Sequence, residues 1–76
     1  MTDTARIHAE ASVLAYQQLR DHLNRVRALA VRGDIRSARR VAGDVVSDLD
    51  EIQRLRDEGA VIADAEAAVA AKLEEL

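Results

Sequence analysis

Apolar residues recur at spacings of three and four along almost the whole chain, and no proline interrupts them. That period places the side chains on one face of an α-helix, and no stretch keeps the two-residue alternation of a half-buried strand for long. Only three glycines, Gly33, Gly43 and Gly59, are present to mark helix ends. The sequence therefore predicts one all-α domain over residues 1–76.

The first helix is predicted over residues 4–32, with Asp3 or Thr4 as its N-cap. Its apolar positions, among them Leu19 and Val26, spread over roughly half of the helical wheel. A face that wide suits a helix that touches two neighbours rather than one.

Arg32-Gly33-Asp34 matches a tripeptide that cell-adhesion receptors read, but each residue has a structural explanation. Arg32 is a cation in the last turn of a helix, where the macrodipole favours positive charge. Gly33 supplies the positive φ that ends a helix, and Asp34 caps the next one. The tripeptide is therefore predicted to be the corner between two helices.

Two architectures fit residues 34–76. In the first, Gly59 caps a second helix over 34–58 and Asp64 begins a third helix over 64–76, which makes a small three-helix bundle. In the second, the rhythm of threes and fours runs through Gly59, and a single long helix makes a long-armed two-helix hairpin. The sequence leaves both open.

The predicted core is thin for a free-standing domain. A chain of 76 residues buries only about 60% of its unfolded surface, and this one has twenty Val, Leu and Ile residues but no Phe, Trp or Cys. Without disulfides or a cysteine-bound metal, self-association is the remaining common way to stabilise a small fold, so we expect a homodimer or higher oligomer. The aliphatic residues expected at its interface are Ile35, Val45, Leu49, Ile52, Ile62, Val69 and Leu73.

Charge is divided unevenly along the chain. The first 40 residues hold eight arginines and four acidic residues, whereas the rest hold three basic and ten acidic residues. Such polarity concerns partners rather than fold. Antiparallel self-pairing explains it, because the basic part of one copy would meet the acidic part of another.

Arg36, Arg39 and Arg40 occupy the first two turns of the second predicted helix, where the helix dipole disfavours cations. Aspartates of the same chain could neutralise them, or they could contact an acidic protein surface or nucleic-acid phosphates. The candidate aspartates are Asp21, Asp44 and Asp48. Nucleic-acid binding over residues 20–40 would have to use phosphates, because one tyrosine cannot form a base-stacking platform.

His8 and His22 project onto the apolar side of the first predicted helix. Neither has a carboxylate three or four residues away, the spacing that would favour a metal site on one helix face. Ser12 lies four residues after His8, but no orienting acid shares their face. We expect both histidines to pack beside the core, with no metal and no cofactor, and we expect the protein not to be an enzyme.

The first ten residues lack the basic and apolar regions of a secretory signal, and no apolar run approaches the roughly 20 residues of a membrane span. Ten arginines against one lysine, with abundant alanine and valine, are typical of a GC-rich genome. The sequence predicts a cytoplasmic, non-enzymatic protein–protein interaction module, an adaptor, regulator or structural subunit of a bacterial or phage complex. The alternative is a small nucleic-acid-associated regulator that binds backbone phosphates.

Overall fold

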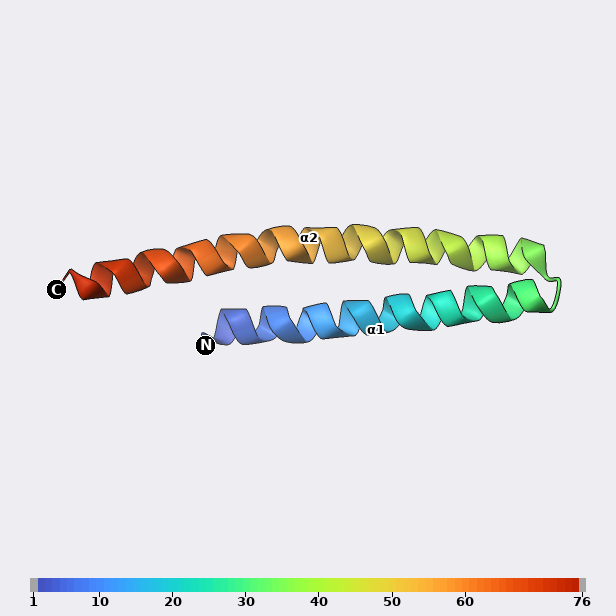
Figure 1. The fold of residues 1–76 in the computed structure, drawn as a ribbon, viewed down its shortest axis with the longest axis horizontal. Coiled ribbons are helices and arrows are strands. Elements are labelled where there is room, and N and C mark those ends of the chain that lie inside the picture. Colours follow the sequence, from blue (N-terminus) through green and yellow to red (C-terminus); the bar gives the residue numbers. More distant parts are fainter. Residues whose placement is uncertain (1, 76) are drawn as a thin grey trace.

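The computed structural model describes residues 2–75 and contains two antiparallel helices joined by a tight turn (Figure 1). Helix α1 spans Asp3–Val31 and helix α2 spans Ile35–Glu74. Together they form a rod of 65 × 15 × 13 Å with a Cα radius of gyration of 18.1 Å. A globular domain of this length would have a radius of gyration of about 11 Å. The fold is thus an open helical hairpin, and the long-armed alternative is confirmed.

The turn uses Gly33 and Asp34 in their predicted roles, whereas Arg32 is the C-cap of α1 rather than a residue of its last turn. Gly33 has a φ of +82°, the left-handed conformation that ends a helix. Its N–H donates to the carbonyl of Ala30, and the N–H of Asp34 donates to the carbonyl of Leu29, both over 3.0 Å. This pair of bonds is the Schellman motif. Asp34 then caps α2, because its Oδ1 accepts from the N–H of Ser37 over 3.2 Å. Hydrogen bonding from the Ser37 side chain and from its N–H lowers the pKa of Asp34.

The start of α1 differs by one residue from the prediction over 4–32. Thr2, rather than Asp3 or Thr4, is the N-cap, because its Oγ1 accepts from the N–H of Ala5 over 3.1 Å. Asp3 lies in the first turn instead, where its negative charge is favourable to the helix dipole.

Helix α2 continues through Gly59 without a break, so the prediction of separate helices over 34–58 and 64–76 is wrong. Residue 76, the predicted end of the third helix, lies outside the described residues. Neither Gly59 nor Asp64 ends or begins a helix, since both lie well inside α2.

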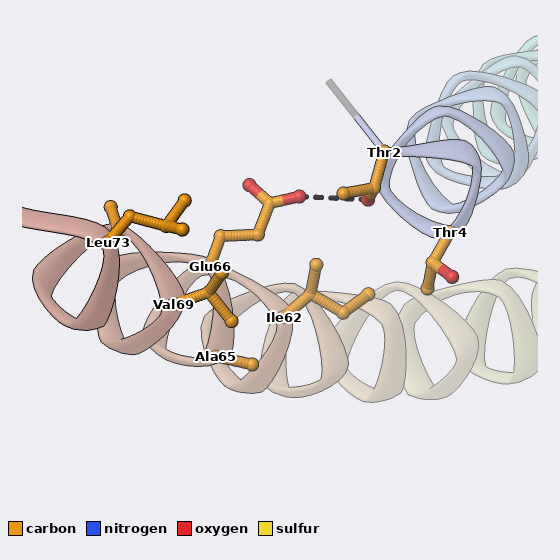
Figure 2. A pocket seen from close by; sticks show the side chains of 8 residues that line it. Thr2, Thr4, Ile62, Ala65, Glu66, Val69 and Leu73 are labelled. Carbon is orange, nitrogen blue, oxygen red and sulfur yellow. Dashed lines mark hydrogen bonds between the residues drawn. The ribbon is translucent and has the colours of Figure 1, made fainter. Parts of the chain in front are cut away.

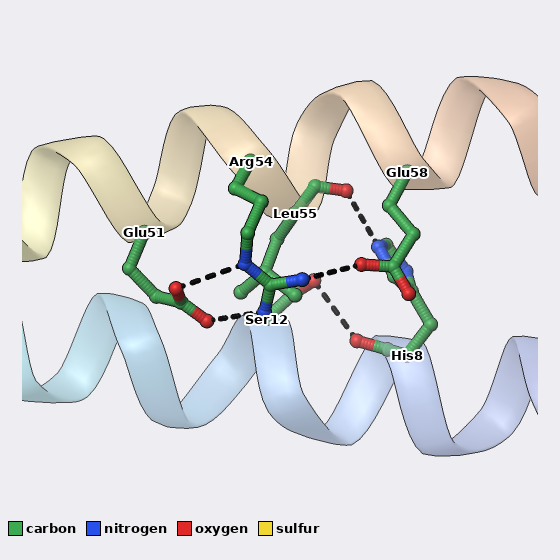
Figure 3. A network of polar contacts seen from close by, with 6 residues as sticks. All are labelled: His8, Ser12, Glu51, Arg54, Leu55 and Glu58. Carbon is green, nitrogen blue, oxygen red and sulfur yellow. Dashed lines mark hydrogen bonds and ion pairs between the residues drawn. The ribbon is translucent and has the colours of Figure 1, made fainter.

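Gly59 provides space for a side chain of α1 rather than a helix end. A Cβ built there would lie 2.8 Å from Cε1 of the His8 ring. The ring lies across the glycine, and its Nε2 donates to the carbonyl oxygen of Leu55 over 2.5 Å (Figure 3). Glycine at this position therefore makes room for a contact between the two helices, which no local signal in the sequence reveals.

The two helices meet along one seam. The residues of α2 that lie on the seam are spaced alternately three and four positions apart. The buried and half-buried residues of α1 have the same spacing. The α2 residues are Ala38, Val41, Val45, Asp48, Ile52, Leu55, Gly59 and Ile62. Two small apolar clusters lie on the seam, one of Ala15, Ile52 and Leu55 and one of Leu29, Ala38 and Val41.

Replacing Gly43 with alanine should stabilise the protein by about 1 kcal/mol, because alanine favours a helix interior and nothing lies within 4 Å of the added Cβ. Gly59→Ala should bring little or no gain. There the new methyl group displaces the His8 ring and breaks a hydrogen bond worth about 1 kcal/mol. Urea unfolding followed by circular dichroism measures both free energies.

The control for this comparison is a His8→Ala background. Without the ring, both glycine substitutions should stabilise the protein equally. Equal gains from Gly43→Ala and Gly59→Ala in the otherwise unchanged chain would contradict the role assigned to Gly59.

Candidate functional site

A polar pair interrupts the apolar seam between its two clusters. Nδ1 of His22 on α1 donates to Oδ2 of Asp48 on α2 over 2.5 Å. The Asp48 side chain is only 10% exposed and that of His22 is 35% exposed. A buried carboxylate is costly without a partner, so this bond favours the alignment of α1 and α2 in which His22 lies opposite Asp48. The hydrogen bond to Asp48 raises the pKa of His22, and the charges of Asp44 and Asp21 act in the same direction.

His8 and Ser12 also form hydrogen bonds with the backbone. Oγ of Ser12 donates to the carbonyl of His8 over 2.9 Å, one helical turn back, while His8 itself bonds to the carbonyl of Leu55. Both histidines lie beside the core, as the sequence predicts. Within residues 2–75, no group of three His, Cys, Asp or Glu side chains is arranged to hold a metal ion.

The pairing of Asp48 is the contact that sequence reasoning missed. Ile35, Val45, Leu49 and Ile52, which are predicted at the self-association interface, lie on one stripe of α2. This stripe contains Leu49 but not Asp48, the residue directly before it. A neighbouring stripe with the same spacing contains Asp48, and this is the one that faces α1. An acidic residue on an otherwise apolar stripe, opposite a histidine on the other helix, was the available signal.

One flank of the hairpin carries charged side chains of α2. A shallow pocket there is lined by Ile7 and Ala11 of α1 together with Arg54 and Glu58 of α2. Arg54 is held in place by two carboxylates, with Nη2 2.6 Å from Oε1 of Glu51 and Nη1 2.8 Å from Oε2 of Glu58 (Figure 3). This network lowers the pKa of Glu51 and neutralises the guanidinium.

The opposite flank carries large apolar side chains of both helices, with Arg20, Arg27 and Arg56 among them. Tyr16 and Leu23 directly follow the seam residues of α1, and Leu49 directly follows Asp48 on α2. Because the helices are antiparallel, the residues that directly follow seam residues in the sequence lie on the same side of the hairpin in both helices. We call this surface the apolar flank; its members, between 48% and 58% exposed, are Tyr16, Leu23, Ile35, Val46 and Leu49.

Beyond the N-terminus of α1, helix α2 continues alone (Figure 1). All of residues 63–75 are exposed, and we call this segment the arm. Val69 and Leu73, 60% and 64% exposed, continue the steps of three and four beyond Ile62. The arm therefore carries a piece of seam that α1 is too short to cover.

A groove of about 630 Å³ lies where the N-terminal end of α1 meets the arm (Figure 2). Its apolar lining comes from Ile62, Val69 and Leu73, and Oγ1 of Thr2 donates to Oε1 of Glu66 over 2.9 Å at its edge. The groove is open along the arm and presents mostly carbon atoms, so it is suited to an apolar side chain or helix rather than to a polar substrate.

The predicted interface residues are distributed over three places. Ile35 and Leu49 lie on the apolar flank, and Val69 and Leu73 lie on the arm. Val45 and Ile62 are half-buried at the seam, and Ile52 is buried at 7% between the two helices. Ile52 therefore contributes to the hairpin itself, whereas Ile35, Leu49, Val69 and Leu73 are accessible.

The arginines near the turn are exposed and unpaired. Among the described residues, none of Arg36, Arg39 and Arg40 forms an ion pair, and the arginines that do are Arg6, Arg20 and Arg54. Within residues 2–75, none of the three predicted aspartates forms an ion pair with these arginines: Asp21 pairs with Arg20, Asp48 pairs with His22, and Asp44 forms no ion pair. We call the six arginines of residues 25–40 the arginine turn; they are Arg25, Arg27, Arg32, Arg36, Arg39 and Arg40.

The chain matches no family model, no curated protein and no solved structure. Across residues 2–75, neither helix has a stretch long and apolar enough to cross a membrane. Function is therefore argued from the hairpin's own surfaces: an apolar flank, an uncovered arm and an arginine turn.

The His22–Asp48 pair predicts a pH dependence of stability. Because the pKa of His22 is raised in the folded protein, the folded state binds this proton more tightly than the unfolded chain does. The resulting stabilisation is complete below the unfolded pKa of about 6.5 and is lost as the pH rises through the folded value. The urea midpoint should therefore fall as the pH is raised from about 6.

His22→Gln and Asp48→Asn are the controls, and each should flatten this part of the pH profile. The same decrease in the His22→Gln variant would show that another group is responsible.

Proposed function

We propose that the protein is a non-enzymatic helical assembly module that associates with copies of itself. The observation that carries this proposal is the distribution of large apolar side chains over the hairpin. Among residues 2–75, the only large hydrophobic residues that are buried are Leu29, Val41, Ile52 and Leu55. Twelve other large hydrophobic residues are 48% to 80% exposed. Exposed apolar groups of this size, such as the apolar flank and the arm, are typical of a protein–protein interface.

The total surface area supports the same conclusion. The chain exposes 6032 Å², whereas a globular monomer of 8.3 kDa would expose about 4,600 Å². The excess of roughly 1,400 Å² is larger than the ~800 Å² that each partner buries in an interface of standard size. One such interface would remove more than half of this excess.

The hairpin is suited to be a preformed half of such an assembly. Its register is set internally by the His22–Asp48 pair, and its turn by the Schellman motif at Gly33. A partner therefore meets a surface that is already ordered, which lowers the entropic cost of binding. We infer a role as an adaptor, regulator or structural subunit. The arginine-rich composition supports a bacterial or phage complex, and the cysteine-free sequence supports the cytoplasm as its location.

Binding of nucleic-acid phosphates is the second candidate, and the unpaired arginines favour it. Their placement is less favourable, because helical spacing sets Arg25 and Arg32 on the charged flank and Arg27 and Arg39 on the apolar flank. Phosphate-binding proteins usually gather cations on one face or along one stripe. Affinity for duplex DNA that falls steeply with salt would favour this candidate.

Self-association is tested by measuring mass with light scattering over a protein concentration series. The unchanged protein should reach the mass of an oligomer, and Leu49→Asp should shift the transition to at least tenfold higher concentration, since a charge would be buried in the interface. The matched control is Leu14→Asp, a 55% exposed leucine seven residues after Ile7, on the charged flank. It should leave the oligomer intact.

Circular dichroism of each variant establishes that the helices are formed. A monomeric mass of the unchanged protein across the whole series would contradict the proposed function.

A further inference from the structure

We propose that the partner is a second copy of this chain lying antiparallel to the first, so that the arm of each hairpin runs along the arginine turn of the other. This inference rests on the proposed self-association and adds its direction and its contacts. The apolar flanks would supply most of the affinity, and the charged ends would set the orientation.

The two ends of the rod carry opposite charge. The arginine turn has six arginines and a single acidic residue, Asp34. The arm, at the other end, has one lysine and four acidic residues, namely Asp64, Glu66, Glu74 and Glu75. Two rods that lie side by side in opposite directions bring each basic end to an acidic end, whereas a parallel pair would bring like charges together.

The charges at both ends are available for a partner. Among the described residues, the arginine turn forms no ion pair, and in the arm neither Asp64 nor Glu74 forms one. By contrast, Arg54 in the middle of α2 is neutralised by two carboxylates of its own helix. Within residues 2–75, the arginine turn and these two acidic residues of the arm are thus left without ion pairs within the chain.

The lengths of the elements agree with this arrangement. Helix α2 has 40 residues, a length of about 60 Å, and therefore runs along nearly the whole 65 Å of the rod. When two such helices overlap in opposite directions, the first turns of one are level with the last turns of the other. Arg36, Arg39 and Arg40 of one copy would then lie level with the arm of its partner.

The apolar residues at both ends also need a cover. Val69 and Leu73 continue the seam past the point where Thr2 meets Glu66, and α1 of the same chain does not reach them. Ile35, 54% exposed at the start of α2, lies at the turn end of the apolar flank. In the antiparallel dimer the uncovered seam of the arm would meet the turn end of the second hairpin, where Ile35 lies.

Charge reversal tests the arrangement. A turn variant, Arg36→Glu with Arg39→Glu and Arg40→Glu, should weaken dimerisation at least tenfold, and so should an arm variant, Asp64→Lys with Glu74→Lys and Glu75→Lys. The chain that combines all six substitutions should recover the dimer, because attraction between the ends is restored with its signs exchanged. Sedimentation at low and high salt measures each dissociation constant, and the differences should shrink at high salt.

Misfolding does not account for the expected losses. Glutamates in the first two turns of α2 are favourable to its dipole, lysines at positions 74 and 75 are favourable at its C-terminal end, and residue 64 is exposed. Helix content measured by circular dichroism should therefore stay at the level of the unchanged protein in all three variants.

Crosslinking provides a second readout, because the chain has no cysteine of its own. The Arg39→Cys and Ala70→Cys variants should crosslink to each other through a short bismaleimide when they are mixed. Arg39→Cys alone should give little crosslinked dimer, since the two turns lie at opposite ends.

The outcomes separate this inference from the proposed function. A dimer that tolerates the turn and arm variants, or that the combined variant fails to restore, would overturn the antiparallel arrangement and leave self-association standing. A protein that is monomeric under all conditions would overturn both.

Discussion

A two-helix hairpin can bury only one stripe of each helix, and the other features of this protein follow from that constraint. Each helix presents a single narrow face to its neighbour, whereas the apolar positions of α1 and α2 cover wider arcs. The hairpin therefore closes over Leu29, Val41, Ile52 and Leu55 and leaves larger numbers of aliphatic side chains outside. This surplus is what a self-associating module requires, and it is also why the core of one chain is thin.

Polar contacts decide which stripe is buried. Two stripes of α2 have the same spacing, and they share Ala38, Val45 and Ile52. The one that faces α1 adds Val41 and Leu55 and places Asp48 beside His22, while the other would have buried Ile35 and Leu49. Burying Asp48 is tolerated because the imidazole satisfies it, and Gly59 lets the His8 ring reach the backbone of α2. Ile35 and Leu49 are thereby left on the outside, on the apolar flank.

The charge distribution follows the same division between the inside and the outside of the hairpin. Folding the chain back at Gly33 gathers arginines of both helices at one end of the rod, and the longer α2 carries the acidic residues to the other. Cations at the start of α2 oppose the helix dipole, so they do not serve the stability of the isolated hairpin. They become favourable when an acidic surface covers them, and the acidic arm of a second copy is such a surface.

The sequence by itself determined the all-α class, the corner at Arg32-Gly33-Asp34 and the limits of α1 to within one residue, because caps and helical periodicity are local signals. It also placed both histidines beside the core. Only the tertiary structure decided that α2 passes through Gly59, that Asp48 belongs to the seam, and that Ile35 and Leu49 lie outside it. These outcomes depend on contacts between residues 26 to 51 positions apart, such as His22 with Asp48 and His8 with Gly59. Spacing within one helix cannot choose between two equivalent stripes, but a partner helix with its own polar residues can.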